Sequence, residues 1–370
     1  MTVPASESAR IVWSTAVSAV EPDLLYRGYR VDDLAESATF LETAFLLVSG
    51  DLPTSEQWAD WQALLIGGLT LPDNILSWLK RVPAAATPMD VLSGGLTRTR
   101  LAEGPPVRGS SQDVQDSLPH WLGFVTAVVA ARVRMTRGDL PMEPRDDLGF
   151  AGNVWWLFQG REPSPPVEKS LETLLVLGAD HGMAPATVAV RLAAATGADF
   201  PAALQAGISV AMSRRPVGQA EASLDVLHEV RSADRARVWV SQMAAKEKAI
   251  AGFEHRIYRV GDPRADWVAP LCRRAAERTG RQEREELASA IEGAVWDQLQ
   301  RLPSVIWPAA RLLDYLGFDR GTFGPLYVIA RMAGWAAHFV EQRESGPTPA
   351  TTTLYVGVPP RRFQADHERA

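Results

Sequence analysis

Hydrophobic residues recur three or four positions apart along most of the 370-residue chain, which is the spacing of one face of an α-helix. Several of these stretches follow residues that commonly begin helices. Thr54 has Gln57 three positions later, and Ser164 is followed by Pro165. The pattern predicts helices over much of the chain, including 54–69, 163–182, 232–253, 284–302 and 321–343.

Strand candidates are few and short. They are 10–17 (RIVWSTAV) near the start and 351–358 (TTTLYVGV) near the end. Because strands and helices do not alternate, a doubly wound parallel sheet is disfavoured, and we predict an all-α protein. Residues 101–117 are rich in Pro, Gly and Ser and are predicted to form a surface loop. The charged tail beyond Pro359 is expected to fray.

Composition is that of a soluble globular protein, with 46% hydrophobic and 22% charged residues. A net charge of −6 argues against binding to nucleic acid or to anionic membranes. No stretch approaches the roughly 18 apolar residues of a membrane span, and the N-terminus does not resemble a secretory signal. We therefore expect a cytoplasmic protein, and the abundance of Ala, Arg, Leu and Val suggests a bacterial source.

Candidate chemistry is concentrated in one stretch, GFEHRIYRVGDPRA at 252–265. It places Glu254 beside His255 and puts Arg264 nine positions after the histidine, behind a Gly-Asp-Pro turn. Such cations are predicted to grip an anion. The single cysteine, Cys272, excludes an internal disulfide framework and is expected to be a buried apolar residue. No two of the six histidines have the spacing of helical metal ligands, so we predict no metal site.

The same stretch resembles the citrate synthase motif G-F-G-H-R-V-Y-K-x-x-D-P-R-A. Further segments resemble that family in the family's order, so that the resemblance covers roughly residues 12–358. These segments are LLYRGYRVDDLAESATFLETAFLLVSGDLPT at 24–54, PMDVL at 88–92, GREPSPPVEKSLETLLVLGADHGMAPAT at 160–187 and FGPLYVIARMAGWAAHFVEQR at 323–343. Within the family, residues 178–199 are most like the short actinobacterial second citrate synthases and the methylcitrate synthase-like proteins.

The resemblance implies an all-α subunit with two domains and a cleft between them, assembled as a two-fold dimer. The large domain would comprise 1–215 and 318–370, and the small domain 216–317. It also implies an acyltransferase related to the tricarboxylic acid cycle. Such an enzyme joins an acyl-CoA to a 2-oxo acid such as oxaloacetate in a Claisen-type condensation, with no covalently bound cofactor.

The half of the family's site that holds the 2-oxo acid is largely retained. His255 matches the histidine that polarises the ketone, and His181 matches the oxaloacetate-binding histidine. Two arginines that bind carboxylates are matched by Arg264 and Arg331. A third arginine, contributed in the family by the partner subunit, is replaced by Ala350, or by Thr348 if two residues are inserted.

The half that activates the acyl-CoA differs from the family at three positions. Pro216 or Val217 stands where the enol-stabilising histidine belongs, and Ile306 stands where the carboxylate base belongs. Glu254 replaces a glycine that lets the backbone approach CoA closely. Because a base and an enol donor each contribute roughly 10²–10⁴-fold, we expect ordinary citrate synthesis to be weak or absent.

Three interpretations remain open. The chain is a divergent enzyme that uses Glu254 or Glu221 as a substitute base, a non-catalytic subunit paired with an active citrate synthase paralogue, or a carboxylate-binding sensor. The first and second interpretations imply a homodimer and a heteromer respectively. Glu254 is expected either to reshape the CoA side of the cleft or to pair with Arg256 or Arg215.

Overall fold

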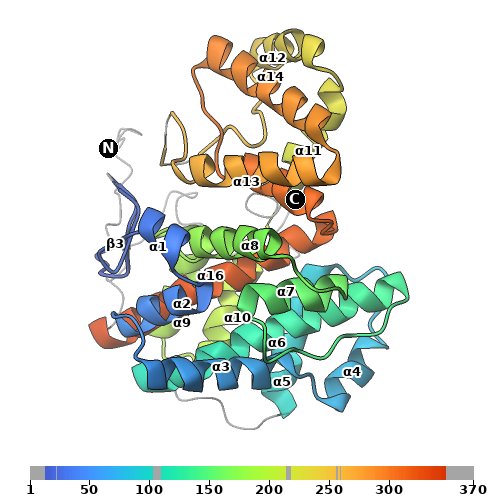
Figure 1. Ribbon diagram of the computed structural model, residues 1–370. Helices are drawn as coiled ribbons and strands as arrows, with labels where there is room; N and C mark the ends of the chain where they lie inside the picture. Colours follow the sequence, from blue (N-terminus) through green and yellow to red (C-terminus); the bar gives the residue numbers. More distant parts are fainter. Residues whose placement is uncertain are drawn as a thin grey trace, which may run out of the picture.

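The computed structural model describes residues 13–21, 23–102, 110–213, 218–255, 257–258 and 260–346. Within these ranges the chain is a packed array of α-helices with one small antiparallel sheet of order β1-β2-β3 (Figure 1). The predicted all-α fold is confirmed.

The sheet is a short hairpin with one further strand. Strand β1 (Ser18–Ala19) pairs with β2 (Leu25–Tyr26), and β2 pairs with β3 (Tyr29–Arg30). Arg27 and Gly28 both have positive φ, as a two-residue hairpin turn requires. The predicted strand at 10–17 is wrong for its described residues 13–17, because pairing starts from this turn and reaches only to Ser18. The candidate at 351–358 lies outside the described residues.

The described chain also contains sixteen α-helices and two short 3₁₀ helices, joined by turns and loops. The first eight are α1 (Val31–Ser37), α2 (Phe40–Ser49), α3 (Ser55–Leu69), α4 (Asp73–Leu79), α5 (Pro88–Ala102), α6 (Ser111–Arg137), α7 (Phe150–Gln159) and α8 (Pro165–Gly178). The others are α9 (Pro185–Ala195), α10 (Phe200–Ala211), α11 (Gly218–Val230), η1 (Ala233–Arg235), α12 (Ala236–Ala245), α13 (Arg264–Thr279), α14 (Gln282–Leu299), α15 (Ile306–Tyr315), η2 (Arg320–Thr322) and α16 (Phe323–Ser345).

The predicted helix starts are confirmed with one difference in chemistry. Thr54 and Gln57 form the expected reciprocal capping box at α3. Ser164 precedes α8, but its side chain makes no capping hydrogen bond, and Pro165 supplies the start. The helix predicted over 232–253 is shorter, because α12 ends at Ala245 and Glu247 has a left-handed φ of 51°.

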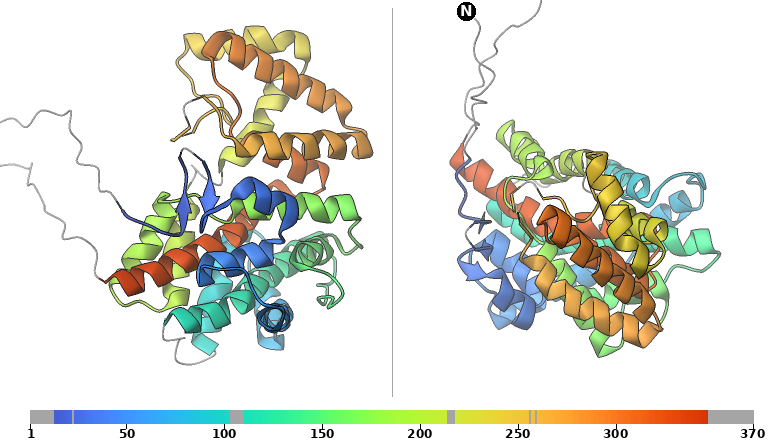
Figure 2. Two further views of the ribbon diagram at one scale, coloured as in Figure 1. Left: turned by 60° about the vertical axis from the view of Figure 1, so that its left-hand side comes forward. Right: turned by 90° about the horizontal axis from the view of Figure 1, so that it is seen from above.

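The helices form two groups of unequal size. Helices α11 to α15 pack mainly against one another and lie at the top of Figure 1, while the remaining helices form the larger group below. Helix α13 contacts α8, and α11 contacts α16, so these pairs join the two groups. Figure 2 shows the same division from two other sides. The domain limits 1–215 with 318–370, and 216–317, stay a prediction.

Helix α16 lies in the middle of the larger group, in contact with α2, α6, α8, α9 and α10. It approaches the end of α8 so closely that the amide of Gly334 donates to the carbonyl of Ala179 at 3.0 Å. A Cβ at Gly334 would lie 2.6 Å from that carbonyl oxygen and 2.3 Å from Asp180 Oδ1. Only glycine therefore permits this contact.

Replacing Gly334 by alanine is expected to force α16 away from Asp180 and to lower the free energy of unfolding by about 2 kcal/mol or more. The measurement is urea unfolding followed by circular dichroism. The control is Gly67→Ala in α3, where an added Cβ meets no atom within 4 Å. That change should raise stability by about 0.5–1 kcal/mol through helix propensity. Equal effects of the two substitutions would contradict the steric interpretation.

A buried carboxylate joins three helices of the larger group. Glu172 on α8 accepts a hydrogen bond from the amide of Phe40, the first residue of α2, at 2.6 Å. It also accepts from the amide of Ala151 in the first turn of α7. Burial, opposed by the Phe40 amide and reinforced by Glu168, raises the pKa of Glu172 to about 7. The folded protein therefore favours the protonated acid more than the unfolded chain does.

The raised pKa gives a pH-dependent stability with a defined sign. The contribution of Glu172 is fully present below its unfolded pKa of about 4.5 and is lost as pH rises through about 7. Relative to Glu172→Gln, the wild-type protein should lose on the order of 3 kcal/mol of unfolding free energy over this interval. Urea titrations of both proteins at pH 4.5 and pH 8 measure this. If the difference in unfolding free energy between the two proteins is the same at both pH values, the raised pKa of Glu172 is contradicted.

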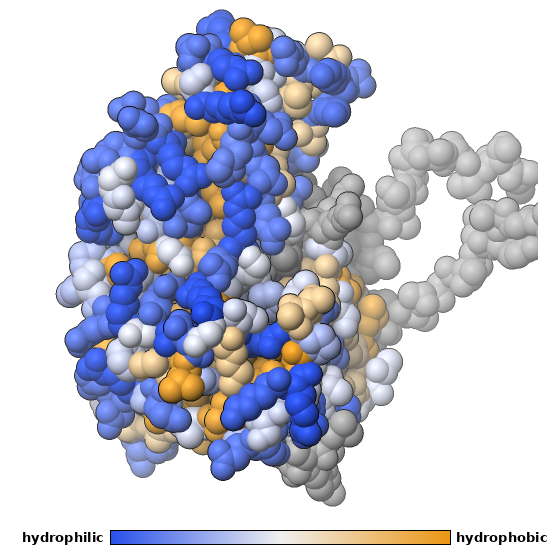
Figure 3. All heavy atoms as spheres, turned by 90° about the vertical axis from the view of Figure 1, so that its right-hand side faces the viewer, coloured by the Kyte–Doolittle hydropathy of each residue, from blue (hydrophilic) through white to orange (hydrophobic). Residues whose placement is uncertain are grey.

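Other sequence expectations can be compared with the described surface and core. Cys272 is buried, as predicted. None of the helices that the structure describes combines the length and the apolar character that crossing a bilayer requires. The face shown in Figure 3 is mainly hydrophilic, with hydrophobic residues in scattered patches.

Candidate active site

Tertiary packing brings together four residues that the sequence predicts to bind a 2-oxo acid. His181 lies in the turn after α8, and His255 lies in the loop between α12 and α13. Arg264 is the first residue of α13, and Arg331 lies within α16. The rings of His181 and His255 meet at 5.1 Å between centroids and 80° between planes. Both arginines act electrostatically on His181, so all four share one site.

The turn that carries His181 is held by a tyrosine from the hairpin. The hydroxyl of buried Tyr26 donates to the carbonyl of Asp180 at 2.8 Å and accepts from the amide of Asp180 at 3.1 Å. It also lies 3.2 Å from the carbonyl of Val176, near the end of α8. Burial raises the pKa of Tyr26 to about 12, so it remains a neutral donor. The hairpin therefore positions His181 through the backbone.

Tyr258 was missed by sequence reasoning and lies between the two histidines. Its ring stacks on His255 at 4.6 Å and 23°, and its hydroxyl lies 3.3 Å from His181 Nε2. The hydroxyl donates to the carbonyl of Val20 at 3.2 Å. Because a hydroxyl has one proton, the bond with His181 requires Nε2–H of the imidazole as donor. A tyrosine three residues after a motif histidine is a signal that could have been used.

His181 is a neutral imidazole in this environment. Burial lowers its pKa most, and the positive charges of Arg264 and Arg331 lower it further. A protonated ring would be disfavoured beside two guanidinium groups. His181 thus adds no charge to the site, and its Nε2–H is donated to Tyr258.

His255 is also oriented by its neighbours. Its Nδ1 accepts from the backbone amides of Ile257 at 3.2 Å and Tyr258 at 3.1 Å, so the proton of the neutral ring is on Nε2. Burial lowers the pKa of His255; the Asp262 carboxylate opposes this and Arg264 adds to it. A neutral imidazole with a fixed Nε2–H can donate to a carbonyl oxygen, which is the chemistry needed to polarise a ketone.

The two arginines differ in how far their donors are used. Arg264 is held by Asp262 through two bonds, Nε to Oδ1 at 2.9 Å and Nη2 to Oδ2 at 2.8 Å. Arg331 is only 3% exposed, yet its Nε and Nη1 have no partner in the described part of the chain. Its guanidinium lies 5.1 Å from the ring centroid of Tyr327. Buried donors of this kind are rarely left unpaired, so Arg331 is suited to an anionic ligand.

The position predicted to have lost the base lies beside the motif loop. The amide of Ser304 donates to the carbonyl of Gly252 at 2.7 Å, and the amide of Val305 donates to Asp262 Oδ2 at 3.2 Å. Ile306 follows as the first residue of α15, half-buried. Its hydrocarbon side chain can neither accept nor donate a proton.

The remaining predicted positions are only partly described. Glu254 is exposed on the same loop, and its carboxylate lies 3.8 Å from Nη1 of Arg301, a partner that sequence reasoning did not consider. Glu221 lies in the first turn of α11. The expected partners of Glu254 and the other degenerate positions fall outside the described residues: Arg256, Arg215, Pro216, Val217, Thr348 and Ala350.

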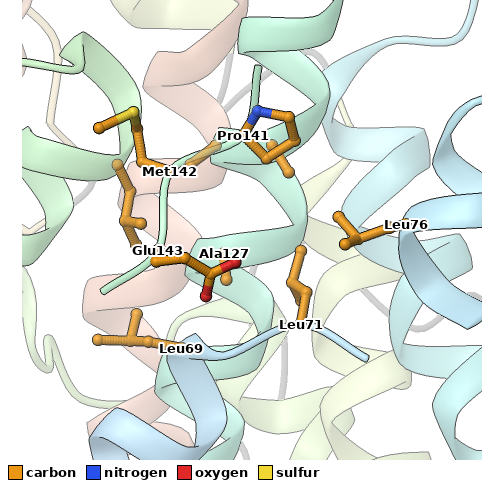
Figure 4. A pocket seen from close by; sticks show the side chains of 10 residues that line it. Leu69, Leu71, Leu76, Ala127, Pro141, Met142 and Glu143 are labelled. Carbon is orange, nitrogen blue, oxygen red and sulfur yellow. The ribbon is translucent and has the colours of Figure 1, made fainter. Parts of the chain in front are cut away.

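Two further observations separate this cluster from other kinds of site. Among the described residues, no three His, Cys, Asp or Glu side chains gather as metal ligands would. A small apolar pocket lies elsewhere, between α3, α4, α6 and α7 (Figure 4). Its volume of about 20 Å³ has room for about one water molecule. The histidine and arginine cluster remains the better candidate for chemistry.

The fold and the cluster define an all-helical protein whose site gathers neutral histidines and buried arginines at the junction of two helical groups. The family model described as "Citrate synthase, C-terminal domain" matches residues 8–349. The chain therefore belongs to the citrate synthase family, as its motifs predict.

Individual relatives extend over nearly the whole chain. "Citrate synthase 2" of Bacillus subtilis (strain 168) is 28% identical over 96% of this chain and 96% of its own length. "2-methylcitrate synthase" of Mycobacterium tuberculosis is 30% identical over 94% of this chain and 88% of its own length. The crystal structure of citrate synthase from Thermotoga maritima MSB8 matches with a TM-score of 0.86 and 25% identity, covering 100% of both chains.

A second structure agrees in fold. Citrate synthase from the archaeon Thermoplasma acidophilum, solved as a ternary complex with carboxymethyl coenzyme A and oxaloacetate, matches with a TM-score of 0.89. It is 21% identical and covers 98% of each chain, so this likeness concerns the fold alone.

Proposed function

We propose that the cluster binds a 2-oxo dicarboxylate of the oxaloacetate type. The observation that carries this proposal is the buried guanidinium of Arg331, whose Nε and Nη1 have no partner in the described chain. One carboxylate of the ligand would be bound in a fork by Nε or Nη1 together with Nη2, since Nε and Nη1 lie on different edges of the guanidinium. The free Nε2–H of His255 would donate to the ketone oxygen, and Arg264 and His181 would complete the anion site.

We further propose that the chain belongs to the enzymes that condense a CoA thioester with such an acid, but that its own condensation of acetyl-CoA is slow or absent. In this reaction a base removes a proton from the thioester methyl group, and the deprotonated carbon then attacks the carbonyl carbon of the ketone. Hydrolysis then releases CoA. Ile306 cannot remove that proton, and Glu254 is directed at Arg301. These two observations also favour the non-catalytic subunit as the second candidate function.

The substitution Arg331→Met is expected to weaken oxaloacetate binding by about tenfold or more, since a charge-assisted hydrogen bond is worth about 1.5–3 kcal/mol. Calorimetric titration of the purified protein measures this. The control is Arg343→Met on the same helix, where the side chain is exposed and its Nη1 donates to the carbonyl of Ala194 at 3.4 Å. Absence of binding to the wild-type protein, or equal binding by the two variants, would overturn the proposed ligand site.

The rate of condensation is a separate measurement. Wild-type protein with acetyl-CoA and oxaloacetate should release CoA thiol at least about 10²-fold more slowly than an active citrate synthase assayed in parallel, because no base stands at position 306. A thiol reagent follows the release, and propionyl-CoA is tested in the same way. Rapid release by the pure protein would contradict the slow-condensation proposal while leaving the binding proposal intact.

A further inference from the structure

One face of α16 presents an arginine and a histidine to a single carboxylate. Arg331, Gly334 and His338 follow one another at intervals of three and four residues, so they lie along the same stripe of the helix. Asp180, from the turn after α8, lies across this stripe. Its Oδ2 is 3.4 Å from His338 Nε2, and its Oδ1 lies over Gly334, where a Cβ would be 2.3 Å away.

The two oxygens of Asp180 are unequally used. Oδ2 accepts from the hydroxyl of Ser18, from the amide of Gly182 at 2.8 Å and from His338. Oδ1 is buried and has no hydrogen-bond partner in the described part of the chain. An unpaired oxygen on a fully buried carboxylate is costly, so Asp180 is poised to accept another donor.

That donor would be Arg331, one helical turn before Gly334. Arg331 and Asp180 are close enough for the arginine to help lower the pKa of the carboxyl, yet they form no ion pair within 4.0 Å among the described residues. Burial by itself would raise the pKa of Asp180, but His338 and then Arg331 and Ser18 hold it at about 2. The carboxylate is therefore charged, and its pairing with His338 leaves Arg331 unpaired.

We propose that His338 is a positioning residue. By pairing with Asp180 Oδ2 it holds this carboxylate away from Arg331, so that the Arg331 guanidinium stays available to a carboxylate ligand. Without a positive charge at position 338, Asp180 turns to Arg331 and competes with the ligand. This inference rests on the proposed function, because it assigns a cause to the free donors of Arg331.

The charge on His338 is set by the groups that face it. Asp180 approaches His338 Nε2 from the turn after α8. His338 Nδ1 lies 3.7 Å from the carboxylate of Glu341, which is also on α16, and 3.4 Å from Nη1 of Arg191 on α9. Burial lowers the pKa of His338 and Arg191 does so weakly, but the two carboxylates raise it above its usual value. His338 is thus charged below this raised pKa and neutral above it, so ligand affinity should fall as pH rises through it.

The test compares His338→Gln, Asp180→Asn and the double variant by calorimetric titration with oxaloacetate at pH 6.5. Glutamine keeps a hydrogen-bond donor but not the charge, so His338→Gln should bind about tenfold more weakly or worse. Asp180→Asn should bind as well as the wild-type protein or more tightly. The double variant should regain affinity to within about threefold of Asp180→Asn, because the competing carboxylate is gone. Equal weakening in the single and double variants would overturn the inference in favour of a merely structural role.

A crystal structure of ligand-free His338→Gln provides the second readout. A carboxylate oxygen of Asp180 should lie within hydrogen-bond distance of Arg331, which requires no ligand and no activity. If His338→Gln fails to fold, wild-type affinity measured from pH 6 to pH 9 replaces it, and a flat profile would overturn the inference. If the wild-type protein does not bind oxaloacetate but the variant shows the new ion pair, the proposed function is rejected. The inference that His338 keeps Asp180 from pairing with Arg331 would then still hold.

Discussion

The site depends on one close contact between α16 and the end of α8. Gly334 allows the two backbones to touch, and its amide donates to the carbonyl of Ala179. This contact places Asp180, from the turn after α8, against α16 between Arg331 and His338. Because burial removes water from all of these charges, each must be paired inside the protein or held ready for a ligand. Among the described residues, Arg331 keeps buried Nε and Nη1 donors without a partner, and the proposed anion binding rests on these donors.

Neighbouring charges shift the pKa values of the three histidines in different directions. Burial and neighbouring guanidinium groups lower the pKa of His181 and His255, whereas the carboxylates of Asp180 and Glu341 raise the pKa of His338 against burial. Neutral imidazoles avoid further repulsion of Arg264 and Arg331, and the Nε2–H of His255 suits a ketone oxygen. The same residue type thus serves as a hydrogen-bond donor or as a counter-ion according to which charges surround it.

The predicted acyl side of the site has a different character. Backbone hydrogen bonds join Gly252, Val260 and Asp262 to Ser304, Leu302 and Pro303, so the described parts of the motif loop and the start of α15 form one rim. On this rim Ile306 stands at the position predicted for the family's base, and the carboxylate of Glu254 lies 3.8 Å from Nη1 of Arg301. A hydrocarbon side chain at that position cannot abstract a proton.

The sequence by itself determined the helical fold and predicted the residues of the candidate site, because helical periodicity and ordered motifs are local and need no knowledge of contacts. It could not show that Tyr258 joins the two histidines, or that His338, given no role from its sequence context, pairs with Asp180. These contacts link residues from 77 to 158 positions apart. Tertiary structure also decided tautomers, charges and the unpaired state of Arg331, since burial and neighbouring charges set the cost of ionisation.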